Sequence, residues 1–127
     1  MKQEEKIFAQ HAEHTEWRSK LKFYNDEISI LRNRLSEIVS KNTNLEALKQ
    51  VEHFENQLII QKNNIDELNH LINVDEDKLT HEVVHNPVAV DHRKVHYHAE
   101  EKEAIDTFEK NFNELRNEFK VFASKLM

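Results

Sequence analysis

Large apolar residues recur along the chain at alternating spacings of three and four, a pattern typical of α-helices with one narrow buried stripe. Three such stripes follow one another: Ile7, Trp17, Leu21, Tyr24, Ile28, Leu31, Leu35 and Ile38; Leu48, Val51, Phe54, Leu58, Ile65, Leu68, Ile72 and Leu79; and Ile105, Phe108, Phe112, Leu115, Phe119, Phe122 and Leu126. The pattern predicts an all-α fold of three long helices.

Polar residues between the stripes set the expected helix boundaries at about 3–41, 44–85 and 91–126. Thr43 and Glu46 have the spacing of a capping box, which predicts the start of the second helix. Pro87 predicts its end, because the residue before a proline avoids the helical region. Asp91 is a good N-cap for the third helix. A break of the second helix near 73–77, giving a fourth helix, is an alternative.

Short connections predict antiparallel neighbours, whose paired residues should have numbers with a constant sum. The stripes pass this test along their whole length, for the first helix against the second and for the second against the third. The resulting layers are Trp17/Leu68/Phe108, Leu21/Ile65/Phe112, Ile28/Leu58/Phe119, Leu31/Phe54/Phe122 and Leu35/Val51/Leu126. We therefore expect residues 1–127 to form a single domain, an antiparallel three-helix coiled-coil bundle.

Two parts of the stripes are polar. In the middle of the bundle Tyr24, Gln61 and Leu115 share a layer, which predicts a buried hydrogen bond from the tyrosine hydroxyl to the glutamine amide. At the end of the bundle that holds the second connection, successive layers are His14/Ile72/Ile105, Gln10/Asp75/Glu101 and Ile7/Leu79/His98. Imidazoles, carboxylates and an amide are thus predicted to face the core within about two helical turns.

Composition narrows the chemistry. The chain contains no Cys and no Gly, so disulfides, thiolate chemistry and glycine-rich phosphate loops are excluded. A net charge of −6 disfavours nucleic acid and anionic membranes as partners. No stretch is apolar enough for a membrane span or a signal peptide, so we expect a soluble, cytoplasmic protein. Nine histidines among 127 residues are an enrichment and draw attention to the polar end of the bundle.

Burying two carboxylates side by side is unfavourable unless a cation lies between them. The first interpretation is a divalent metal, iron, zinc or manganese, because imidazole and carboxylate suit these ions. The expected ligands are His14, Asp75, His98 and Glu101, with Gln10, His11, Glu13, His81, Glu82 and His85 as additional candidates. Metal handling, oxygen or redox chemistry and structural stapling are all open as its purpose, and the sequence does not decide whether the chain is an enzyme.

Other interpretations need no metal. Protonated His14 and His98 could pair with the carboxylates, or this end could be solvated. The protein would then be a non-enzymatic coiled-coil module that binds a protein partner or forms a homodimer.

The segment His81–His85 also matches the H-E-x-x-H pattern of zinc hydrolases, a remote alternative for a chain without strand signals. Within it, Glu82 and His85 resemble one half of the ligand pattern of ferritin-like di-iron bundles. That resemblance would imply a second copy on another helix, whereas the second copy, Glu67 and His70, lies on the same predicted helix.

Overall fold

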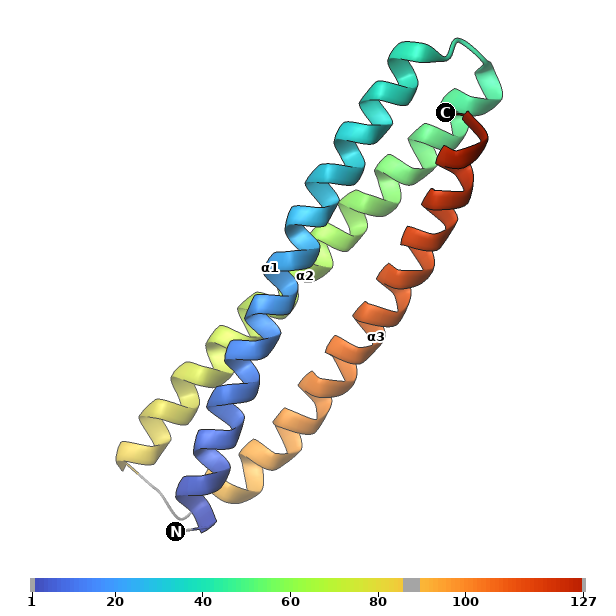
Figure 1. Ribbon diagram of the computed structural model, residues 1–127. Coiled ribbons are helices and arrows are strands. Elements are labelled where there is room, and N and C mark those ends of the chain that lie inside the picture. The colour runs from blue at the N-terminus through green and yellow to red at the C-terminus, as the bar shows by residue number, and fades with distance from the viewer. Residues whose placement is uncertain (1, 86–89, 127) are drawn as a thin grey trace.

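The computed structural model describes the backbone of residues 2–85 and 90–126, and the side chains of residues 8–78, 80 and 99–126. Three helices account for this backbone: α1 (Lys2–Lys41), α2 (Leu45–His85) and α3 (Val90–Leu126). They lie side by side as an elongated antiparallel bundle, with the N-terminus at one end and the C-terminus at the other (Figure 1). The described residues contain no strand, so the prediction of an all-α three-helix bundle is confirmed.

The helix boundaries agree with the predicted ones to within a residue, and one alternative is wrong. Helix α2 continues through residues 73–77 without a break, so there is no fourth helix. This segment holds no Gly or Pro, and nothing in its sequence interrupts the backbone hydrogen bonding. Helix α3 begins at Val90, which places Asp91 inside its first turn and not at the N-cap.

The connection between α1 and α2 shows a different cap from the predicted one. The Asn44 side-chain oxygen accepts a hydrogen bond from the backbone N–H of Glu46 at 2.8 Å. The backbone carbonyl of Asn44 accepts a hydrogen bond from the backbone N–H of Leu48 at 3.0 Å. Asn44 is therefore the N-cap, and the capping box expected from Thr43 is wrong. At the end of α1, Asn42 Nδ2 donates to the carbonyl of Ile38 at 2.9 Å and satisfies one of the last free acceptors.

The predicted register is borne out by the core. All residues of the five apolar layers are buried, except Phe122 and Leu126, which are partly buried and pack against the others. Aromatic rings meet where the layers predict, since the Phe54 and Phe122 centroids lie 5.1 Å apart. Each layer removes large apolar side chains from water, and this burial is the main stabilising term of the bundle.

The predicted Tyr24–Gln61 hydrogen bond is wrong. The Tyr24 hydroxyl instead donates to Glu109 Oε2 on α3 at 3.0 Å. The charged carboxylate of Glu109 is a stronger acceptor than the neutral amide of Gln61, which has the same chain length. Burial raises the pKa of the Tyr24 hydroxyl, and the Glu109 carboxylate raises it further. Gln61 is left with 7% exposure and with an amide oxygen, Oε1, that has no hydrogen-bond partner among the described residues.

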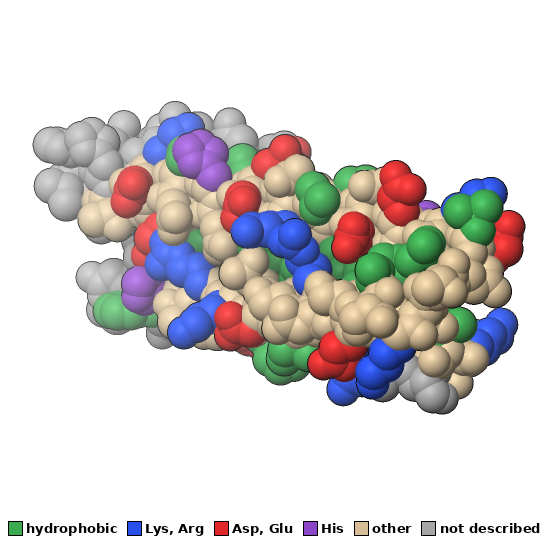
Figure 2. Space-filling model, turned by 90° about the horizontal axis from the view of Figure 1, so that it is seen from above, with side chains coloured by type: hydrophobic (Ala, Val, Ile, Leu, Met, Phe, Trp, Pro, Cys, Tyr) green, Lys and Arg blue, Asp and Glu red, His purple; other side chains and the backbone are tan. Residues whose placement is uncertain are grey.

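On the face of the bundle that Figure 2 shows, acidic and basic side chains are interspersed with apolar ones. The large exposed ones include Phe8, Phe23, Ile30, Leu45, Leu71 and Val121. Such side chains are a candidate surface for a partner. No described helix is long and apolar enough to cross a membrane.

Candidate metal centre

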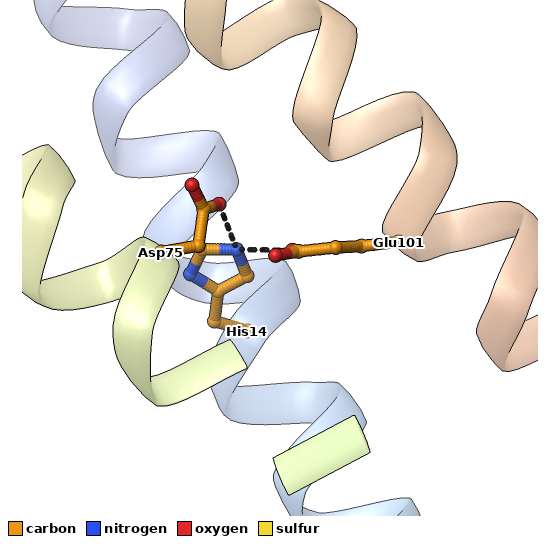
Figure 3. Close-up of side chains that lie close together, drawn as sticks. All are labelled: His14, Asp75 and Glu101. Carbon is orange, nitrogen blue, oxygen red and sulfur yellow. Dashed lines mark ion pairs between the residues drawn. The ribbon is translucent and has the colours of Figure 1, made fainter. Parts of the chain in front are cut away.

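Three helices bring one side chain each to a buried point near the end of the bundle that holds the N-terminus. His14 comes from α1, Asp75 from α2 and Glu101 from α3, and the two carboxylates converge on the same imidazole nitrogen (Figure 3). His14 Nε2 lies 3.4 Å from Asp75 Oδ2 and 3.3 Å from Glu101 Oε2. One potential ligand atom from each residue lies within 4.8 Å of the other two.

The register explains why these three residues meet although His14 belongs to the neighbouring layer. Helical side chains lean toward the N-terminus of their own helix. The His14 ring therefore leans toward the layer of Gln10, which α2 and α3 complete with Asp75 and Glu101. The carboxylates approach it from the two other helices, so no single helix could form this group alone.

The group is shielded from solvent. The side chain of His14 has no exposed surface, and Asp75 and Glu101 expose 7% and 11% of theirs. The Trp17 ring lies against His14 with 5.5 Å between centroids, and Ile72 and Ile105 close the adjoining layer of the core. Low polarity on this side strengthens electrostatic interactions and raises the cost of uncompensated charge.

A third carboxylate, Glu76, holds the other side of the His14 ring. Its Oε2 contacts His14 Nδ1, while its Oε1 contacts Nδ1 of His11 one turn earlier on α1. Burial by itself raises the pKa of the Glu76 carboxyl, but the two imidazoles lower it below its usual value. The sequence-based ligand set missed Glu76 because it lies off the core stripe. The feature of the sequence that could have identified Glu76 is its position directly after Asp75, on the side of α2 that faces α1.

In the absence of a metal, His14 is the cation of this group. Burial on its own lowers the pKa of His14, but Asp75, Glu101 and Glu76 raise it to about 10. Imidazolium therefore satisfies the requirement for a positive charge between the carboxylates. With all three carboxylates ionised, the four side chains still carry a net charge of −2. One proton on Nε2 can point toward only one of the two carboxylates that face it.

The distances around Nε2 also suit a metal ion. Ligand atoms at zinc lie about 2.0–2.2 Å from the ion, so two tetrahedral ligands are separated by about 3.3–3.6 Å. The separations of 3.4 and 3.3 Å between Nε2 and the two oxygens agree with this value. They are longer than the usual 2.7–2.9 Å of a charge-assisted hydrogen bond. Replacing the Nε2 proton by a divalent ion would also reduce the buried negative charge by one.

The remaining sequence-predicted ligands fall into two classes. Gln10 is buried in the same region, His11 is exposed and contacts Glu76, and Glu13 is half-buried and outside the converging group. The side chains of His81, Glu82, His85 and His98 lie outside the described residues, so their proposed roles stay predictions.

Comparisons with protein-family models, with curated proteins and with solved structures found no match to this chain. The site is therefore interpreted from its own geometry: a three-helix bundle with a buried His14/Asp75/Glu101 group that could hold a metal ion.

Proposed function

We propose that the protein binds one divalent metal ion, zinc, iron or manganese, through His14 Nε2 and the carboxylates of Asp75 and Glu101. The observation that carries the proposal is the convergence of two carboxylates from different helices on one buried imidazole nitrogen, at separations typical of ligands that share an ion. One nitrogen and several oxygens suit all three metals, and the absence of thiolate disfavours copper(I).

Glu76 supports this assignment independently. Histidines that bind metals usually donate their second ring N–H to a carboxylate, which fixes the tautomer and the orientation of the ring. Glu76 contacts Nδ1 in this way and leaves Nε2 directed at Asp75 and Glu101.

The test is a calorimetric titration of the metal-free protein with Zn²⁺ and with Mn²⁺, repeated on His14→Asn, Asp75→Asn and Glu101→Gln. Loss of a direct ligand should weaken binding by more than the roughly 10- to 100-fold typical of an outer-shell change. Glu76→Gln should fall within that outer-shell range. If the three ligand variants bind metal as strongly as the wild-type protein does, the proposal is contradicted.

Matched controls lie on the exposed faces of the same helices. Asp77→Asn on α2, Glu103→Gln on α3 and His70→Asn on α2 each make the same chemical change at an exposed position. They should bind metal with unchanged affinity. Equal losses in variants and controls would indicate a nonspecific effect of charge on metal binding, and would also contradict the assigned site.

A second candidate function, an interaction module, rests on a groove between α1 and α3. The groove has a volume of about 510 Å³, and Ile30, Phe119 and Ala123 are among its apolar lining. Arg34 and Lys120 also line it, so an amphipathic helix with an acidic edge would be complementary in charge.

A photo-crosslinking residue at Ile30 tests this candidate in cells. An equivalent residue at Arg32, which is exposed and lies on a different face of α1, is the control. A product formed at 30 and not at 32, and containing an acidic helix, would support the interaction module. A product that contains only a second copy of the chain would support a homodimer instead.

A further inference from the structure

The buried amide of Gln10 is not explained by the fold. Gln10 exposes only 7% of its surface, and its Oε1 has no hydrogen-bond partner among the described residues. A buried polar atom without a partner costs stability, because it loses its hydrogen bonds to water and gains none in return. Most such atoms in native proteins are satisfied by another group, a water molecule or an ion.

The position of Gln10 points to the metal site as that partner. Gln10 precedes His14 by four residues on α1, so the two side chains lie on the same face of the helix, one turn apart. Both are buried, and the His14 ring leans toward the turn that carries Gln10. The register places Gln10 in one layer with Asp75 and Glu101, whose oxygens face His14 Nε2. The amide is thus the remaining polar side chain of the layer in which the ion would lie.

From these relations we infer that Gln10 Oε1 is the fourth ligand of the ion. The donor set is then one imidazole nitrogen, two carboxylate oxygens and one amide oxygen. This inference rests on the proposed function, and it adds a purpose for the ion. Zinc sites with four protein ligands are structural, whereas catalytic sites keep one position for water or substrate.

Closure by Gln10 makes the ion a staple for the three helices. Gln10 and His14 anchor it to α1, Asp75 to α2 and Glu101 to α3. The apolar core holds the helices together further along the bundle, whereas the layer next to His14 consists of the polar residues Gln10, Asp75 and Glu101. The bound ion therefore joins the helices where apolar packing is interrupted, and binding contributes directly to the stability of the fold.

The variant Gln10→Leu separates the destabilising effect of the buried amide on the fold from its contribution to metal binding. Without metal it removes a buried amide oxygen that has no partner among the described residues, so the melting temperature should rise, by about 3 °C. With metal it removes a ligand, so affinity for Zn²⁺ should fall by more than the roughly 10- to 100-fold typical of an outer-shell change. The two effects have opposite signs, and a merely structural role for Gln10 cannot produce both.

Gln61→Leu is the matched control. Gln61 has the same exposure of 7% and the same kind of unpartnered amide oxygen, but it lies in the middle layer of the bundle, far from His14. Its replacement should raise the melting temperature in the same way and leave Zn²⁺ affinity unchanged.

Cobalt(II) provides a spectroscopic readout of coordination. The wild-type protein loaded with Co²⁺ should show the intense visible bands of a four-coordinate ion, and Gln10→Leu should change their position and intensity. Unchanged Zn²⁺ affinity and an unchanged Co²⁺ spectrum in Gln10→Leu would overturn the assignment of Gln10 while leaving the three-ligand site intact. A wild-type protein that binds neither metal would overturn both the proposed function and this inference.

Discussion

The pH dependence of metal affinity tests whether His14 Nε2 is a ligand. The three carboxylates raise the pKa of His14 to about 10, against an ordinary value of 6.5. At neutral pH a metal must therefore displace the Nε2 proton. Each pH unit below 10 increases the competition by that proton tenfold, so affinity should rise about 100-fold between pH 6 and pH 8. The lowered pKa of Glu76 keeps its carboxylate ionised over this interval.

The assay is a competition titration with a chromophoric chelator whose own pH dependence is known, at several pH values from 6 to 8. Calorimetry in two buffers with different ionisation enthalpies should give one proton released for each ion bound. His70→Asn is the control and should behave like the wild type, since His70 is exposed. An affinity that does not change with pH, or binding without proton release, would refute the role of His14.

The same pKa shift predicts an opposite trend for the stability of the metal-free protein. A folded-state pKa above the unfolded value means that the folded protein holds more protons between pH 6.5 and 10. The contribution of protonated His14 to the free energy of unfolding is fully present below pH 6.5 and is lost as the pH rises toward 10. Between pH 6.5 and 8 the free energy of unfolding should fall by about 2 kcal/mol. Chemical denaturation in the presence of a chelator measures this change, which saturating metal should oppose.

Three further predictions concern the fold. Asn44→Ala should lower the free energy of unfolding by about 0.5–2 kcal/mol through loss of the N-cap, whereas Thr43→Ala should change it little, as urea denaturation will show. Phe112→Ala, at a position with no exposed surface, should cost about 3–5 kcal/mol in the same assay. A double-mutant cycle between Arg116 and Glu27, whose Nη2–Oε1 distance is 2.8 Å, should give a coupling energy of about 1 kcal/mol; zero coupling would contradict a stabilising role for this α1–α3 pair.

The fold was predictable because one physical requirement repeats along the chain. Apolar side chains must recur at the helical spacing along most of each core stripe, and both helix pairings must satisfy the same register. The side-chain hydrogen bonds were less predictable. Thr43 and Asn44 are both good caps, and the choice between them depends on where the first helical turn begins. Tyr24 bonds to Glu109 and not to Gln61 because a long charged side chain outside the stripe reaches into the layer.

The candidate site was partly predictable for the same reason. The register brought His14, Asp75 and Glu101 to neighbouring layers, because all three occupy core positions of their stripes. Glu76 lies outside the stripe, and its contact with His14 depends on the direction of two side chains, which spacing alone does not give. The sequence left open whether a metal ion or a protonated histidine supplies the positive charge between the carboxylates. That balance depends on distances between side chains from three different helices.

The most direct test of the central claim is the metal content of the protein at equilibrium. Untagged wild-type protein and Asp75→Asn should be dialysed against a low, buffered concentration of Zn²⁺ at pH 8 and measured by elemental analysis. We predict one ion per wild-type chain and little or none in the variant. No bound ion in the wild type, or equal occupancy in both proteins, would contradict a metal site at His14, Asp75 and Glu101.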